Sequence, residues 1–171
     1  WLIGAVPHVI VVNPQRVPVT DLKGLLELAR RNPGKLNYAS AGNGTSHHLA
    51  AELFKLQTQT YITHIPYRGA GPALQDLIAG QVDILFDGLA SSATHIRGGR
   101  IKALAVAAPK RAPGFPEIPT SAEAGVPSLS ALLTAASAEA ARVVPIARRA
   151  EGLAYHGLAM NVAIAVAPAL G

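Results

Sequence analysis

The chain has 171 residues, of which 50% are hydrophobic and 15% are charged, against roughly 25% charged residues in an average soluble domain. This composition excludes a disordered chain, and the length fits one domain or one domain plus an appendage. The formal net charge is +5, but Lys and Arg are scattered without a run of five. We therefore expect no nucleic-acid partner, whereas a mildly positive field suits a small anion.

Missing residue types exclude further classes of protein. The chain has no cysteine, so it forms no disulfide, thiolate nucleophile or cysteine-bound zinc site. No stretch of about 20 uninterrupted apolar residues occurs, and we expect no membrane span. The sequence opens at Trp1 without a basic-then-apolar leader, which is typical of a mature or truncated form.

The first predicted elements are a strand, a helix and a second strand. His8 to Asn13 is an apolar, β-branched run that ends before Pro14, which predicts a buried strand of the parallel type. Thr20 is a good N-cap for the following helix, whose apolar residues recur at helical spacing: Leu22, Leu25, Leu26 and Ala29. Residues 35–40 then predict a second strand.

The alternation of helix and strand continues to residue 107. The remaining predicted elements are a helix capped by Thr45 or Ser46, a strand over 61–65, a helix from Pro72 to Gly80, a strand over 82–86, a helix over 89–96 and a strand over 101–107. This order predicts an α/β fold, with helices flanking a parallel or mixed sheet. Ligands of such sheets bind beyond the carboxyl ends of the strands, so the segments of interest are 40–46, 66–71 and 87–92.

The character of the sequence changes near its end. We expect residues 1–127 to form the α/β domain and residues 128–171 to form an Ala-rich tail, helical or irregular. Helix propensity is high over 132–142, and Pro145 should end that helix.

The strongest local signal is the loop between the second strand and the second helix: Ser40, Ala41, Gly42, Asn43, Gly44, Thr45 and Ser46. Its two glycines let the backbone turn sharply and approach a ligand. The helix that follows begins with unpaired N–H groups and a partial positive charge, and the hydroxyl side chains add donors. Together these features predict a nest for a carboxylate or phosphate. A capped glycine turn without a ligand fits the same spacing equally well.

Two further loops carry candidate residues. Tyr67 could offer a hydroxyl and Gly69 an exposed amide, whereas Arg68 is better explained as a solvent-exposed cation. Asp87 follows an apolar strand and could accept hydrogen bonds from loop amides, from a ligand or from the next helix, in whose first turn Ser91 and Ser92 are expected.

Catalytic and metal sites receive less support. Ser46, His48 and Asp87 are the residue types of a hydrolytic triad, but no G-x-S-x-G elbow is present. His47 and His48 are adjacent and point to different helix faces, and H-E-x-x-H is absent, so we expect no metal. His48 is best explained as packed or bonded to the loop. A dinucleotide fingerprint would need a glycine at His47 and an acid after the next strand, and neither occurs.

Five segments in order resemble the receptors of the tripartite tricarboxylate transporter family, also called Bug proteins. The resemblance spans roughly Val9 to Pro127, and the segments that carry it are Pro33 to Ser46 (PGKLNYASAGNGTS), His64 to Gly69 (HIPYRG), Asp76 to Asp83 (DLIAGQVD), Arg100 to Val106 (RIKALAV) and Pro119 to Gly125 (PTSAEAG).

The resemblance implies one domain of a two-domain, periplasmic-binding-protein-like clamshell. It implies that residues 40–45 form the carboxylate loop of the second domain, with His48, Tyr67 and Asp87 at pocket positions. It also implies a periplasmic receptor that binds di- or tricarboxylates, amino acids or aromatic acids, without catalysis or a cofactor, and delivers them to a two-component membrane permease.

The chain departs from the family pattern at both ends. The family's N-terminal third and its opposite ligand loop are not found, and Ser128 to Gly171 lacks the expected return crossover. A frameshifted reading frame and a divergent end both fit this tail. We expect half of the cleft to be missing and binding to be weak, because solvent competes at an open half-site. A Ser-dependent hydrolase, a nucleotide-binding enzyme and the effector-sensing domain of a transcription regulator remain the alternatives.

Overall fold

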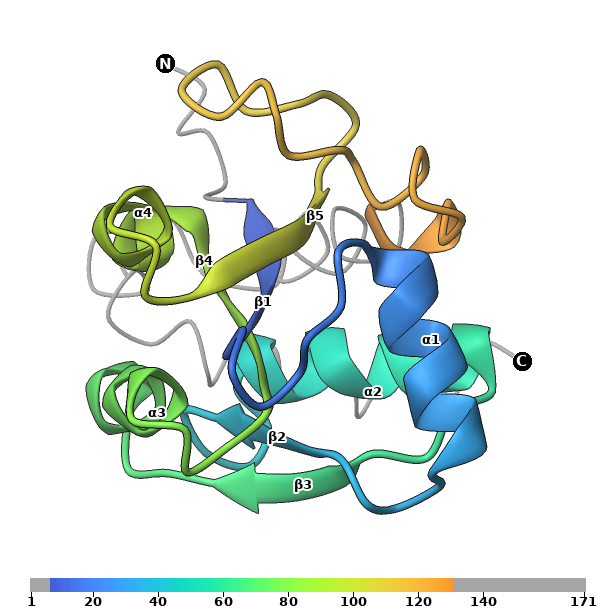
Figure 1. The fold of residues 1–171 in the computed structure, drawn as a ribbon, viewed down its shortest axis with the longest axis vertical. Helices are drawn as coiled ribbons and strands as arrows, with labels where there is room; N and C mark the ends of the chain where they lie inside the picture. Colours follow the sequence, from blue (N-terminus) through green and yellow to red (C-terminus); the bar gives the residue numbers. More distant parts are fainter. Residues whose placement is uncertain (1–6, 131–171) are drawn as a thin grey trace, which may run out of the picture.

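The computed structural model describes residues 7–130, which form a five-stranded sheet with helices on both faces (Figure 1). The sheet order is β3-β2-β4-β1-β5, and its strands are β1 (His8–Val12), β2 (Asn37–Ser40), β3 (Thr63–Pro66), β4 (Ile84–Gly88) and β5 (Lys102–Ala107). The helices between them are α1 (Leu22–Arg31), α2 (Ser46–Thr58), α3 (Ala70–Ile78) and α4 (Leu89–Arg97). Each helix and strand predicted before residue 107 is present, with ends shifted by a few residues.

The sheet is mixed because one central strand runs against the others. β2 is parallel to both β3 and β4, whereas β1 is antiparallel to β4 on one side and to β5 on the other. The prediction of a parallel-type β1 was therefore wrong. A strand buried on both faces has the same apolar composition in either direction, so composition could not reveal the direction of β1.

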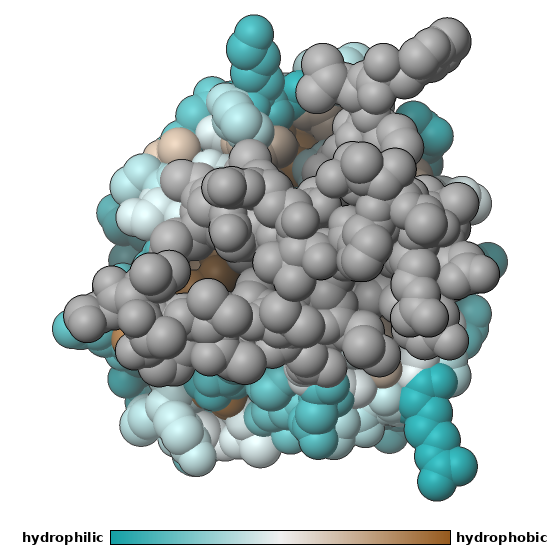
Figure 2. Space-filling view, turned by 180° about the vertical axis from the view of Figure 1, so that it is seen from behind, coloured by the Kyte–Doolittle hydropathy of each residue, from teal (hydrophilic) through white to brown (hydrophobic). Residues whose placement is uncertain are grey.

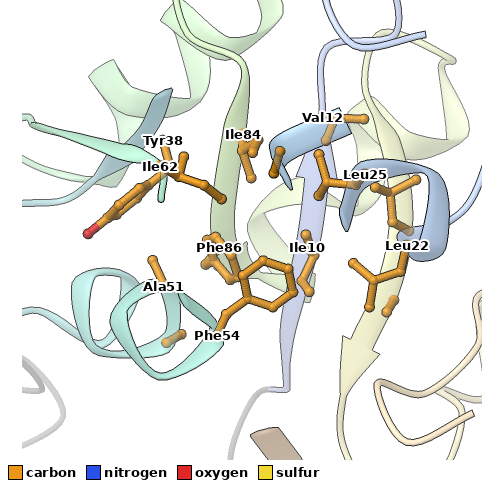
Figure 3. Close-up of a cluster of buried hydrophobic side chains, with 14 of the residues drawn as sticks. Ile10, Val12, Leu22, Leu25, Tyr38, Ala51, Phe54, Ile62, Ile84 and Phe86 are labelled. Carbon is orange, nitrogen blue, oxygen red and sulfur yellow. The ribbon is translucent and has the colours of Figure 1, made fainter. Parts of the chain in front are cut away.

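Two apolar cores lie on opposite faces of the sheet. On one face α1 and α2 contribute Leu22, Leu25 and Phe54 to a cluster with sheet residues such as Ile10 and Phe86 (Figure 3). The Phe54 and Phe86 rings lie 5.3 Å apart between centroids, and full burial of one such side chain stabilises the fold by about 1.5–3 kcal/mol.

The other core lies between the sheet and the remaining two helices. It joins Val9, Val11 and Leu85 of the sheet to Leu77 of α3 and Leu89 of α4. In Figure 1 these two helices lie on the left and α1 and α2 on the right, with β3 and β5 at the two edges of the sheet. The result is a three-layer arrangement in which the sheet is covered on both sides.

The start of α1 differs from the prediction. Asp21, rather than Thr20, is the N-cap, and its carboxylate accepts a hydrogen bond from the Gly24 amide at 2.8 Å. Asp and Thr both cap helices well, so a shift of one residue decides which of the two is used. The predicted Thr45 cap of α2 is confirmed.

Within residues 7–130 no helix is both long and apolar enough to span a bilayer. Seen from behind, the described residues at the rim of the molecule are mainly hydrophilic (Figure 2). The helix predicted over 132–142 and most of the predicted tail lie outside the described residues.

Candidate ligand-binding site

Three loops meet at one edge of the sheet, beyond the carboxyl ends of the parallel strands β2, β3 and β4. The amide of Tyr67, after β3, donates to the carbonyl of Ser40 at the end of β2 (2.9 Å). His47 Nε2 of α2 lies 3.0 Å from the carboxylate of Asp87 in β4. Because β1 is antiparallel, its first residue, His8, lies opposite Gly88 at this same edge. The expectation that the segments 40–46, 66–71 and 87–92 share one edge is confirmed.

The loop from Ser40 to Ser46 depends on two glycines in unusual conformations. Gly42 has φ +131° and Gly44 has φ +76°, a region of φ that L-residues with a side chain rarely adopt. A Cβ atom at Gly42 would also lie 3.3 Å from the carbonyl oxygen of Tyr67. This close approach holds the β2–α2 loop against the β3–α3 turn.

Three side chains hold the loop from within. The Gly42 amide donates to Ser40 Oγ (3.1 Å), and the Gly44 amide donates to Nδ1 of His48 (3.0 Å). Thr45 Oγ1 donates to the Gly42 carbonyl (2.7 Å) and accepts weakly from the His48 amide (3.4 Å). His48 therefore bonds to the loop, as predicted from the sequence, and its Nδ1 carries no proton in this arrangement.

Three amides of the loop have no acceptor within residues 7–130. No described residue accepts a hydrogen bond from the amides of Asn43, Ser46 or His47. Ser46 and His47 are the first two residues of α2, where N–H groups have no partner within the helix and the dipole adds partial positive charge. This edge of the loop can bind an anion with backbone groups alone.

An aromatic stack supports the loop from beneath. His64 lies between the rings of Tyr38 and His48, with centroid distances of 4.8 Å and 4.2 Å. His64 Nε2 is also 2.6 Å from Ser40 Oγ, and Ser40 is fully buried. Burial, followed by the proximity of the His48 ring, lowers the pKa of His64. The neutral form of His64 is thus favoured under a loop that carries unpaired N–H groups.

Tyr38 anchors the base of this stack. Its hydroxyl donates to Glu52 at 2.6 Å, and Lys55 donates to the same carboxylate oxygen at 2.8 Å. Burial, followed by the Glu52 carboxylate, raises the pKa of Tyr38. Burial acts to raise the pKa of Glu52, but the hydrogen bonds from Lys55 and Tyr38 outweigh it and lower that pKa.

Asp87 is buried, with 1% of its surface exposed, and both of its oxygens have partners. Oδ1 bonds to His47, and Oδ2 accepts from the hydroxyls of Ser91 (2.6 Å) and Ser92 (2.7 Å) in the first turn of α4. Burial acts to raise the pKa of Asp87, but the hydrogen bonds from His47 and the two serines outweigh it, so the pKa lies below its ordinary value. Asp87 is therefore an internal anion at the start of α4.

The third loop is turned toward its own helix. The Tyr67 hydroxyl donates to Asp76 of α3 at 2.7 Å, and burial together with this bond raises the pKa of Tyr67 to about 12. Gly69 is the N-cap of α3, with φ +128° and no side-chain hydrogen bond at the cap. Arg68 is exposed, as the sequence predicted.

The residues named for a hydrolytic triad do not form a relay. Asp87 bonds to His47 rather than to His48, and His48 Nδ1 accepts from the Gly44 amide. Within the described part of the chain, no group of three His, Cys, Asp or Glu residues could hold a metal ion. The described side chains at this edge of the sheet interact through hydrogen bonds and ion pairs.

Sequence reasoning missed two histidines at this site. His47 was considered only as a possible metal ligand, yet it joins α2 to Asp87, and the ring of His8 lies edge-on to it at 6.0 Å. The His47–Asp87 bond joins residues 40 positions apart, and the position of His8 depends on the direction of β1. No local pattern signals either contact.

Comparison with known proteins gives a consistent result. Residues 2–144 match the family model described as tripartite tricarboxylate transporter family receptor. A protein of Pseudomonas sp. strain P51, named for the tcbD-tcbE intergenic region, is 45% identical over 132 residues, which are 77% of this chain and 39% of that protein.

Two solved structures from Rhodopseudomonas palustris also match. Rpa4515 with adipate is 41% identical with a TM-score of 0.69, covering 71% of this chain and 40% of that one. MatC with bound malate is 33% identical with a TM-score of 0.70, covering 72% and 42%. This chain thus spans about two fifths of the length of these three relatives. It belongs to the tripartite tricarboxylate transporter receptor family.

Proposed function

We propose that this chain supplies one lobe of a solute receptor, and that the β2–α2 loop of this lobe binds one carboxylate of a small organic acid. The observation that carries the proposal is the set of unpaired amides at Asn43, Ser46 and His47, held at the N-terminus of α2 by a loop that requires glycine at positions 42 and 44.

The energetics of such a loop suit a small anion. A hydrogen bond to a charged group contributes about 1.5–3 kcal/mol, so two or three amides can hold a carboxylate with a dissociation constant near 1 mM, about −4 kcal/mol. We expect binding no tighter than this, because one lobe leaves the other side of the ligand in water, where solvent competes for the same hydrogen bonds.

The named ligands of the solved relatives support this assignment. One was solved with adipate and the other with malate, and both molecules are dicarboxylates. Family membership supports a periplasmic location and delivery of the ligand to a membrane permease. We assign residues 1–127 to the second lobe of such a receptor.

Each predicted site residue has a place in this proposal. Ala41 to Ser46 form the binding loop, with the Ser46 hydroxyl as an added donor. Ser40 and His48 hold that loop in shape, while Tyr67 and Gly69 form the adjoining wall and Asp87 fixes His47. The described contacts of His48 and Asp87 do not form a relay with Ser46, and family membership supports binding without a catalytic step or cofactor.

Titration of the amide resonances with adipate tests this function. In ¹H–¹⁵N spectra we expect adipate to shift the amides of residues 41–47, with an apparent dissociation constant of about 1 mM. The neutral analogue 1,6-hexanediol, which has the same carbon chain without carboxylates, should leave them unchanged. Equal shifts with both compounds, or adipate shifts confined to other residues, would contradict the proposal.

A further inference from the structure

His47 has one ring nitrogen engaged and one without a partner. Nε2 lies 3.0 Å from Asp87 Oδ1, whereas Nδ1 is buried and has no hydrogen-bond partner in the described part of the chain. The side chain as a whole is 14% exposed. A buried polar atom without a partner destabilises the folded state, so its presence at this edge calls for a reason.

The unpaired nitrogen belongs to the same helix turn as the binding loop. His47 is the second residue of α2, beside the free amides of Ser46 and His47 itself. The two nitrogens of an imidazole ring point in nearly opposite directions, so Nδ1 faces away from Asp87 when Nε2 bonds to it. A group that satisfied Nδ1 would therefore lie on the side of the ring that faces away from the Asp87 carboxylate.

The buried charge of Asp87 poses a problem for an anionic ligand. Ser91 and Ser92 both donate to Oδ2, which leaves His47 as the partner of Oδ1. A ligand carboxylate bound near the start of α2 would be repelled by this internal anion at low dielectric. A cation between the two carboxylates would remove the repulsion.

We propose that His47 is a ligand-contacting residue, whose imidazolium bridges Asp87 and the bound carboxylate. Nε2–H donates to Asp87, and Nδ1–H donates to the ligand. This inference rests on the proposed function of the loop. It makes the site selective for carboxylates over amides or esters of the same acid, and it couples ligand binding to protonation of one histidine.

The groups around His47 are consistent with a bridging cation. Asp87 faces it from β4, and His8 faces it edge-on from β1. On α2 itself, His48 bonds through Nδ1 to the Gly44 amide and lies 3.9 Å from Glu52 through Nε2. Asp87 is the one carboxylate that the described contacts place against His47.

The pH dependence follows from the charge of the bridging form. Binding requires protonated His47, so the affinity for a carboxylate is highest at low pH and falls as the imidazolium loses its proton. Because the imidazolium is the form that donates to both carboxylates, we expect the adipate dissociation constant to rise about fivefold or more between about pH 6 and pH 8. In His47→Gln, where the side chain still offers a donor to Asp87 but cannot become a cation, we expect a change of less than about twofold.

One set of spectra tests this inference and the proposed function separately. Adipate is titrated while the loop amides and the imidazole nitrogens are followed together, with His95→Gln, in the last turn of α4, as the matched control. If adipate moves the loop amides, shifts the His47 ring nitrogens toward their protonated values and shows the pH dependence in the wild type and control only, the inference holds. Shifts in the amides without a response of the His47 ring would overturn it and leave the proposed function intact. No shift in either set would overturn both.

Discussion

Helices α2 and α4 begin at the same edge of the sheet, but the side chains of their first turns have different partners. At α4 the protein provides its own anion, because buried Asp87 accepts from both Ser91 and Ser92. At α2 the capping side chain is the neutral Thr45, and no described residue accepts from the amides of Ser46 and His47. Helix N-termini attract negative charge in general. The start of α4 has the Asp87 carboxylate beside it, whereas no described anion accepts from the amides at the start of α2.

This contrast separates structural polar residues from binding residues. Ser40, Thr45, His48 and Asp87 are all polar residues at the binding edge, yet their described hydrogen bonds are to the protein itself. Within the described range, the backbone amides of Asn43, Ser46 and His47 and the Nδ1 atom of His47 have no hydrogen-bond partner. The polar side chains of this loop therefore indicate how its conformation is held rather than which groups contact a ligand.

The largest expected effect is on stability, from removing the internal anion of α4. In Asp87→Asn we expect the free energy of unfolding at pH 7 to fall by about 3 kcal/mol, because a buried carboxylate with three hydrogen-bond donors is lost. The pKa of Asp87 is lowered in the folded state. Its contribution is therefore present above the ordinary Asp value of about 3.9 and is lost as the pH falls through the folded value.

Urea unfolding followed by circular dichroism at neutral and acidic pH measures this effect. The gap between wild type and Asp87→Asn should narrow as the pH falls below about 4. Asp76→Asn is the matched control: Asp76 is only part-buried and its side chain accepts a bond from Tyr67, so we expect a loss of about 1 kcal/mol. Equal losses of unfolding free energy in the two variants would show that the buried carboxylate of Asp87 contributes no more than the part-buried one of Asp76.

A smaller loss of stability, together with loss of adipate binding, is expected when the loop before α2 is altered. Gly42→Ala places a Cβ at φ +131° and 3.3 Å from the Tyr67 carbonyl, which should cost about 2 kcal/mol and displace the amides of the loop. Gly71→Ala is the control, because its Cβ would meet no atom within 4 Å and alanine favours the helix by about 0.5–1 kcal/mol. If adipate shifts the loop amides equally in both variants, the shape of this loop is not what binds the ligand.

The smallest expected effect concerns the support beneath the loop. The pKa of His64 is lowered by burial and by His48, so the unfolded chain binds a proton more readily than the folded one. The stabilisation is present above the ordinary histidine value of about 6.5 and is lost as the pH falls through the folded value. We expect His64→Gln to flatten the pH dependence of the melting temperature below that value. If the melting temperature of His64→Gln depends on pH as steeply as that of the wild type, protonation of His64 does not contribute to this pH dependence.

Local chemistry was enough to predict the elements and the loops of this chain. The apolar periodicity of α1, the Thr45 cap and the glycine turn at residues 42–44 are each set by neighbours in sequence. The partners of Asp87 and the direction of β1 could not be predicted in this way, because each depends on segments tens of residues away. The expected ligand contacts of Ser40, His48, Tyr67 and Asp87 remain predictions, since their described polar contacts are within the protein.

By itself, the amino-acid sequence determined where the helices and strands form and that a glycine-rich loop precedes α2, because both follow from short-range sterics and apolar periodicity. Only the tertiary structure decided which polar groups form hydrogen bonds within the protein and which have no described partner. In the folded chain β1 runs antiparallel to β4, so His8 lies at the sheet edge that carries the β2–α2 loop. The fold also places His47 against Asp87. Hydrogen bonds between distant segments depend on how the layers pack, and that packing is a property of the whole fold.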